Sequence, residues 1–97
     1  MTISGTSTEY GIDASTEPMD LSDVSTISMH HTALNKQTNG GASLRVYQTD
    51  VGVVAQIEVT DENTVLDISG KGFSGKNYRI AVMAYLATIT VDEVYMV

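Results

Sequence analysis

The sequence predicts an all-β fold, a small β-sandwich with an extended N-terminal arm. Two observations favour this fold class. Between residues 26 and 97, apolar and polar residues alternate with a period of two, as they do in strands that present one face to a core. Clusters of Asn, Asp, Gly and Ser interrupt this alternation about every ten residues, which is the spacing of strands in sandwiches. The length of 97 residues suits one domain.

Residues 1–25 are predicted to form the acidic arm. The segment is rich in Ser, Thr, Asp and Gly, and neither periodic pattern lasts long enough in it to define a core element. Pro18 suits a first helical position, so one helical turn is expected at residues 18–24. We expect the arm to dock on a neighbouring subunit through its acidic and apolar side chains. These interface residues are Glu9, Asp13, Met19, Asp20, Leu21, Asp23 and Val24.

The sandwich domain, residues 26–97, begins with a predicted strand at Thr26. Residues 35–41 read Asn-Lys-Gln-Thr-Asn-Gly-Gly, and because Asn and Gly tolerate positive φ angles, a hairpin or loop is expected there. Further strands are predicted at residues 42–47, 53–59 and 64–68. Their alternation predicts that the following residues face the core: Leu44, Val46, Val53, Ala55, Ile57 and Val59.

Residues 78–97 are apolar on both faces, which is typical of a strand buried on both sides. Its Ala, Met and Leu residues would also suit a helix at residues 78–86, but an exposed helix face needs more charge than one arginine supplies. We therefore predict a strand. The apolar phase changes between Val91 and Val94, which predicts a bulge or tight turn at Asp92-Glu93.

Composition excludes several classes of function. The net charge of -7 argues against a nucleic-acid partner, because phosphate backbones are bound by clustered Lys and Arg. The absence of cysteine excludes disulfides, thiolate metal sites and a cysteine nucleophile. No apolar run is long enough to span a bilayer, and residues 1–5 lack the pattern of a signal peptide, so we expect no membrane partner.

Neither a metal site nor a cofactor is predicted. His30 and His31 are adjacent on a predicted strand, so they point to opposite faces, and we expect one of them to be buried and the other to lie at the surface. Residues 70–75 read Gly-Lys-Gly-Phe-Ser-Gly, which matches the dinucleotide-binding fingerprint. That site also needs a parallel sheet and a helix starting near Gly75, so we interpret this segment as a β loop.

No catalytic residue is predicted either. The chain contains Ser, His and acidic residues, but no Ser occupies a G-x-S-x-G turn of the kind that exposes a nucleophile. The acidic pairs Asp61-Glu62 and Asp92-Glu93 lie at predicted turns, where acidic residues are ordinary. We therefore expect the protein not to be an enzyme.

Three segments resemble the later strands of jelly-roll carbohydrate-binding modules, a fold that is also reused in viral fibres and phage structural proteins. They are Ser-Leu-Arg-Val-Tyr at 43–47, Thr-Asp-Glu-Asn-Thr at 60–64, and Ala-Thr-Ile-Thr-Val-Asp-Glu-Val-Tyr-Met at 87–96. The resemblance implies that the sandwich is jelly-roll-like and has a ligand face. The chain has no Trp, however, and only Tyr47 is expected to point outward from a strand toward a sugar.

Together these observations predict a non-enzymatic structural or assembly subunit. The most specific hypothesis is a phage virion protein, either a capsid decoration (cement) protein or a tail component. It would dock through its N-terminal arm, bind protein subunits of the larger assembly and form a homo-oligomer. The alternative hypothesis is a glycan-binding domain like the carbohydrate-binding modules, with an extracellular or cytoplasmic location. A small dinucleotide-binding fragment is a third hypothesis.

Overall fold

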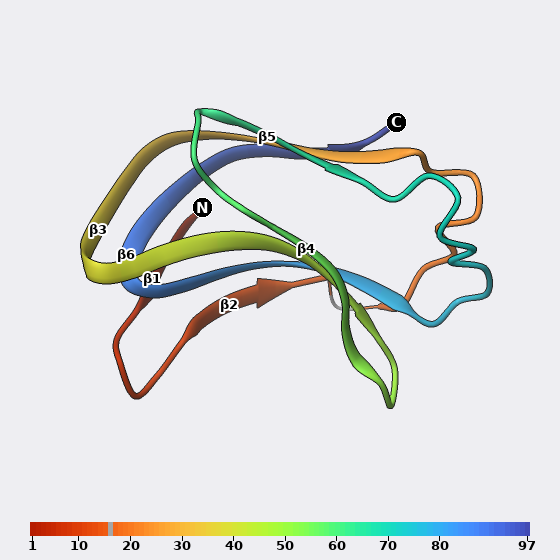
Figure 1. Cartoon of the computed structure of the whole chain (residues 1–97), viewed down its shortest axis with the longest axis horizontal. Helices are drawn as coiled ribbons and strands as arrows, with labels where there is room; N and C mark the ends of the chain where they lie inside the picture. Colours follow the sequence, from red (N-terminus) through yellow and green to blue (C-terminus); the bar gives the residue numbers. More distant parts are fainter. Residues whose placement is uncertain (16) are drawn as a thin grey trace.

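The computed structural model describes residues 1–15 and 17–97, and in this part of the chain it contains strands and no helix (Figure 1). The strands are β1 (Thr2–Gly5), β2 (Gly11–Ala14), β3 (Thr26–Gln48), β4 (Gly52–Glu58), β5 (Asn63–Asp67) and β6 (Tyr78–Met96). The all-β prediction is therefore confirmed. Residues 78–86, for which helix was the competing prediction, belong to β6.

All six strands belong to one antiparallel sheet with the order β1-β6-β3-β4, in which β2 also pairs with β6 and β5 with β3. The long strands β3 and β6 pair with each other along most of their length. Both curve so that the sheet bends over on itself (Figure 1). We call its two parts the β5 half (β5, residues 26–31 of β3 and 91–96 of β6) and the β4 half (β4, β2, residues 41–48 of β3 and 78–85 of β6).

The bend lies where the pairing of β3 and β6 changes register. Lys36 pairs with Ala87 and Gly41 with Tyr85, so four residues of β3 lie opposite the single residue Leu86. Leu86 has a φ of 47°, and a Cβ on Gly40 would lie 2.1 Å from the Leu86 carbonyl oxygen, so only glycine fits there. The hairpin or loop predicted at residues 35–41 is thus a bulge inside one continuous strand. The sequence indicated that the chain changes direction here, but not that a bulge rather than a hairpin or loop makes the change.

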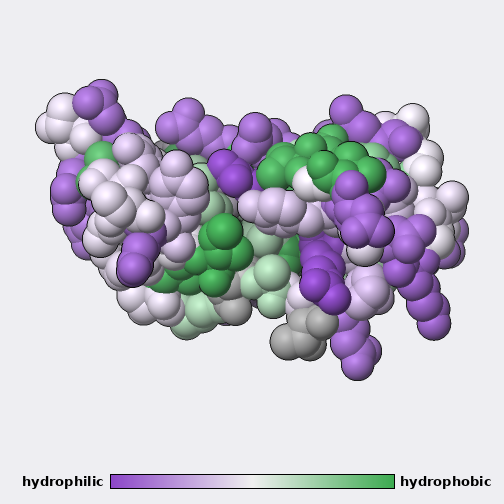
Figure 2. Space-filling view, turned by 90° about the horizontal axis from the view of Figure 1, so that it is seen from below, coloured by the Kyte–Doolittle hydropathy of each residue, from purple (hydrophilic) through white to green (hydrophobic). Residues whose placement is uncertain are grey.

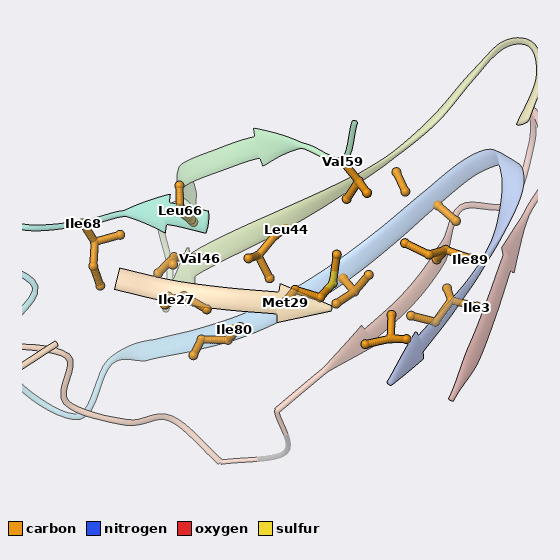
Figure 3. Packing of buried hydrophobic residues seen from close by; sticks show 14 of the residues in the cluster. Ile3, Ile27, Met29, Leu44, Val46, Val59, Leu66, Ile68, Ile80 and Ile89 are labelled. Carbon is orange, nitrogen blue, oxygen red and sulfur yellow. The ribbon is translucent and has the colours of Figure 1, made fainter. Parts of the chain in front are cut away.

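The hydrophobic core lies between the two halves of the bent sheet (Figure 3). Ile27 and Met29 of the β5 half are 0% and 1% exposed, and Leu44 of the β4 half is 0% exposed. β4 differs from the prediction, because Val53 and Ile57 are 40% and 37% exposed. Val53 pairs with Tyr47 beyond a β-bulge, on the face opposite to that of Leu44 and Val46, and Val54 packs against the core instead. Ile57 pairs with Leu44 on the core side, but β4 is an edge strand, and no strand within the described residues covers its outer side.

The N-terminal segment is not a separate arm, which corrects the prediction for residues 1–25. β1 and β2 pair antiparallel with β6 of the same chain. Ile3 is buried, and Leu21 is 2% exposed within the core. The predicted helical turn at residues 18–24 is absent too, since Met19 forms a β-bridge with Tyr78. The sequence did not predict β1 and β2 because backbone hydrogen bonds can hold a four-residue strand whatever its side chains are, and four residues are too few to show a hydrophobic period.

The glycine-rich segment at residues 70–75 is a loop, and strand β6 rather than a helix follows it. The loop packs on the segment before β3. The Leu21 N–H donates to the Phe73 carbonyl oxygen at 3.1 Å, and the Phe73 ring lies 4.9 Å from the Tyr78 ring, centroid to centroid. The helix that the dinucleotide hypothesis requires is therefore absent from this place. Among the described residues, no helix has the length and apolar character needed to cross a membrane.

Candidate protein-interaction site

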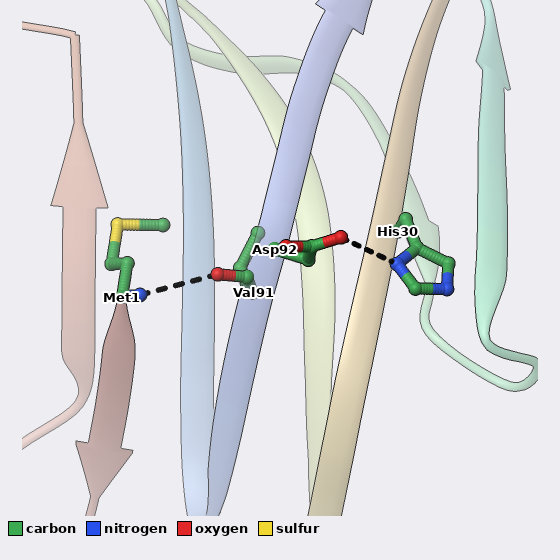
Figure 4. A network of polar contacts seen from close by, with 4 residues as sticks. All are labelled: Met1, His30, Val91 and Asp92. Atoms are coloured by element: carbon green, nitrogen blue, oxygen red, sulfur yellow. Dashed lines mark hydrogen bonds and ion pairs between the residues drawn. The ribbon is translucent and has the colours of Figure 1, made fainter.

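A β-bulge at Asp92 sets the geometry of the last part of β6. His30 pairs with Glu93 and His31 with Val91, so Asp92 is the extra residue, as predicted from the phase change. Its Oδ2 lies 3.2 Å from Nδ1 of His30 (Figure 4). After the bulge the register is regular, and residues 93–96 of β6 pair with residues 27–30 of β3.

One side of β6 is open beyond Val91. On that side, the N–H of Val91 donates to the carbonyl oxygen of Met1 at 2.7 Å, and the amino group of Met1 donates to the carbonyl oxygen of Val91 at 3.2 Å. Figure 4 shows Met1 on one side of β6 and His30 on the other. Within the described residues, no strand pairs with this side at residues 92–96, which we call the β6 edge.

The ladder with β3 determines which backbone groups face the open side. Val97 and Thr26 exchange hydrogen bonds of 3.0 and 3.2 Å, so they form a hydrogen-bonded pair. In an antiparallel ladder such pairs alternate with pairs whose N–H and C=O groups point away. Tyr95 and Glu93 therefore bond to β3, whereas the N–H and C=O groups of Val94 and Met96 point outward, where no described strand pairs with them.

The side chains of Val94 and Met96 face the core but remain exposed. They pair with Met29 and Ile27, and cross-strand partners lie on the same face of a sheet. Met29 and Ile27 are 1% and 0% exposed, yet Val94 is 37% and Met96 is 47% exposed. The difference arises because β3 has neighbours on both sides and the β6 edge has only one.

A hollow of about 430 Å³ lies beside this edge, between the two halves of the sheet. Ile80, Val82 and Met19 line it opposite Val94 and Met96. Asp92 and Glu93 also line it, and both are exposed, whereas no Lys or Arg does so. The hollow is thus mainly apolar and bounded by negative charge, an arrangement that suits apolar side chains accompanied by a cation.

The structure distributes the predicted arm residues over different environments. Leu21 is in the core, Met19 and Val24 are half-buried against it, and Glu9, Asp20 and Asp23 are exposed. Asp13 lies in β2, and its side chain is outside the described part of the chain, as is Thr16. The residues are therefore not one surface. Among the members of this set whose side chains the structure describes, Met19 lines the hollow.

Asp20 stabilises a local turn. Its carboxylate oxygen Oδ1 accepts a hydrogen bond from the Ser22 N–H at 2.8 Å. This bond to the charged form, supported by the Ser22 side chain, lowers the pKa of Asp20 below its usual value. The turn lies next to the buried Leu21. The hydrogen bond from Ser22 thus gives Asp20 a role in the fold that needs no partner subunit.

The predicted ligand residue Tyr47 is half-buried rather than open to a sugar. Nη1 of Arg45 donates to its hydroxyl oxygen at 3.2 Å, and Nε of Arg45 donates to Oγ of Ser43 at 2.8 Å. The Tyr47 hydroxyl is therefore engaged with its neighbour two residues away. The contact is at the hydroxyl and not on the ring face, and sugar binding by Tyr47 stays a prediction.

The prediction of one buried and one surface histidine is confirmed: His31 is 7% exposed, and the side chain of His30 is 34% exposed. Among the described residues, neither Nδ1 of His31 nor the buried Oγ1 of Thr64 has a hydrogen-bond partner. In the part of the chain that the structure describes, no three His, Cys, Asp or Glu residues gather to hold a metal ion.

Comparisons with protein-family models, with curated proteins and with solved structures found no match for this chain. The β6 edge is the candidate site that the sequence did not reveal. The phase change at Asp92 was visible, but the exposure of Val94 and Met96 depends on which strands lie beside them. An apolar residue after a bulge gives no signal of an absent neighbour.

Proposed function

We propose that the chain is a non-enzymatic structural subunit of a larger protein assembly. The most specific form of the proposal is a phage virion protein, acting as a capsid decoration (cement) protein or as a tail component, and located in the virion. The partners are protein subunits, and copies of the chain form a homo-oligomer. Nothing in the proposal requires a cofactor, a nucleic acid or a membrane.

The β6 edge is the observation that supports this proposal. No strand in the described part of the chain pairs with its open side, and the side chains of Val94 and Met96 are core-facing but exposed. Free strand edges readily pair with other chains, and proteins usually protect them with covers, charges or bulges. Here the bulge and the acidic residues lie at one end, at Asp92 and Glu93, and residues 94–96 are unprotected. An assembly subunit gains from such an edge, because docking completes it.

The docking surface therefore differs from the one the sequence suggested. The N-terminal segment is part of the domain's own sheet, so deleting it would remove two strands and the buried Leu21. Such a deletion should unfold the domain rather than only prevent assembly. The β6 edge takes the place of the arm as the docking surface in the proposal.

Sedimentation velocity over a range of concentrations tests the proposal. A subunit of this kind should sediment as a homo-oligomer, and its mass should exceed the 10.4 kDa of one chain. A chain that stays monomeric at every concentration would contradict the homo-oligomer. If it also failed to bind any protein segment at the β6 edge, the assembly proposal would lose its support.

The glycan-binding alternative is favoured by one feature on the outer face of the β4 half. A shallow hollow of about 230 Å³ there is lined by Tyr85, Asn39, Arg45 and Glu58, and the Tyr10 ring packs edge-on against Tyr85 with centroids 5.2 Å apart. Aromatic rings and planar polar groups together suit a sugar. Titration with short gluco- and manno-oligosaccharides, followed by NMR, tests it. Saturable shifts lost in Tyr85→Ala would favour this alternative.

Apolar residues cluster on the side of the molecule that Figure 2 shows. Figure 2 shows the molecule from below, where hydrophobic residues form two patches separated by hydrophilic ones. The exposed large apolar residues of the chain include Ile12 at 51%, Val51 at 66% and Val53 at 40%. Gathered apolar surface is more typical of contact with other proteins than of sugar binding.

A further inference from the structure

The geometry points to a specific mode of docking at the β6 edge: an extended segment of a different, basic protein adds to the sheet as a further strand. We infer that this strand pairs with Val94 and Met96 and places apolar side chains in the hollow of about 430 Å³. The inference rests on the proposed function, because it names the partner's chemistry and its mode of binding at the same site.

The backbone of the β6 edge is prepared for this pairing. Val94 and Met96 each present one N–H donor and one C=O acceptor on the open side, and two residues apart in a strand these groups are about 7 Å from each other. An antiparallel strand offers matching groups at the same interval, so up to four hydrogen bonds can form. Main-chain bonds of this kind provide affinity in strand addition, and side-chain pockets provide specificity.

The hollow selects the side chains of the added strand. Successive residues of a strand point to opposite faces, so every second residue of the partner would point into the hollow beside Val94 and Met96. There it would meet Ile80, Val82 and Met19 from the other half of the sheet. The intervening residues would lie beside Tyr95, which is 47% exposed. The partner should therefore alternate apolar and polar residues.

Charge decides between a different protein and a second copy of this chain. Asp92 and Glu93 line the hollow, no Lys or Arg lines it, and the chain as a whole carries a net charge of -7. A Lys or Arg on the partner strand would meet these two carboxylates at the end of the pairing. A second copy at this edge would bring its own Asp92 and Glu93 against these carboxylates, which opposes pairing here, so the proposed homo-oligomer would form through another surface.

A short peptide of alternating Val and Lys with blocked ends tests the inference on the intact protein, and the same peptide with Glu in place of Lys is its control. The Lys peptide should bind saturably, and the Glu peptide should bind about tenfold more weakly or not at all. Amide hydrogen exchange measured by NMR should then slow at Val94 and Met96. It should change little at Glu93 and Tyr95, whose amides already bond to β3.

A matched pair of proline substitutions locates the binding. Val94→Pro removes an N–H that points outward, so the fold should be kept and peptide binding lost. Tyr95→Pro removes an N–H that bonds to β3, so it should destabilise the domain itself. If Val94→Pro does not fold, the exchange rates of Val94 and Met96 in the unsubstituted protein still decide the matter.

Four results would overturn the inference. Equal binding of the Lys and Glu peptides would remove its charge argument, and unchanged exchange at Val94 and Met96 would place any binding elsewhere. Dissociation of a homo-oligomer by Val94→Pro would make a second copy the occupant of the edge. Absence of peptide binding in a protein that still forms homo-oligomers would refute this inference alone and leave the proposed function standing.

Discussion

Two isoleucine truncations compare the buried and the open parts of the sheet directly. Ile27 is 0% exposed in the centre of the β5 half, and Ile57 on β4 is 37% exposed although it also lies on the core side of its strand. Ile→Ala deletes three carbon atoms, which is worth about 2.5 kcal/mol of transfer free energy when the side chain is fully buried. At Ile27 a cavity adds to this loss, so we expect about 3 to 4 kcal/mol.

At Ile57 the expected cost is lower, because about a third of the side chain is already in water and solvent can fill the space. The transfer loss then falls to about 1.5 kcal/mol, with little cavity cost. Equilibrium unfolding in urea measures both variants, and the free energies of unfolding should differ by about 2 kcal/mol. Equal losses for Ile27→Ala and Ile57→Ala would refute the assignment of β4 as an open edge.

Three further substitutions test individual features of the fold. Gly40→Ala should destabilise strongly, by about 2 kcal/mol or more in urea unfolding, because its Cβ would overlap the Leu86 carbonyl oxygen at the bend. Thr64→Val should leave the free energy of unfolding unchanged or raise it by up to about 1 kcal/mol, since it removes a buried hydroxyl that has no partner among the described residues. A loss of stability of more than about 1 kcal/mol would show that the hydroxyl is hydrogen-bonded. Asp67 accepts bonds from the Ser69 hydroxyl and N–H, which lower its pKa below the ordinary 3.8 in the folded protein. The Asp67 carboxylate therefore stabilises the fold at neutral pH, and this stabilisation is lost as the pH falls below 3.8 through the folded pKa. Asp67→Asn should thus lower the Tm at pH 7 but not at low pH. A Tm difference between the two proteins that persists at low pH would contradict this.

The long strands were predictable from the sequence because their side-chain pattern repeats over many residues. The strand character of residues 78–86, the bulge at Asp92 and the contrast between His30 and His31 all follow from a period of two and its interruption. The same pattern cannot show which strands are neighbours. Ile57 alternates as a core residue should, and it is exposed because none of the described strands lies beyond β4.

The N-terminal strands were missed for a different reason. β1 and β2 are four residues each, and their contribution to the core within the described residues is mainly Ile3. Backbone hydrogen bonds to β6 hold them in place, as in the pair formed by Ile3 and Ile89. Composition reports side chains and not backbone pairing, so a Ser- and Thr-rich strand resembles a polar arm. The candidate site was missed along with them, because the β6 edge is defined by which strands lie beside β6, and the side-chain pattern does not report this.

Amide hydrogen exchange of the protein without any partner tests the central claim most directly. The account predicts fast exchange at Val94 and Met96, whose N–H groups face the open side of β6, and slow exchange at Glu93 and Tyr95, whose N–H groups bond to β3. Slow exchange at all four residues in a monomer would show that another segment covers this edge. Fast exchange at all four would show that the pairing with β3 is not formed. Either result would contradict the claim that the β6 edge is an ordered strand with one free side.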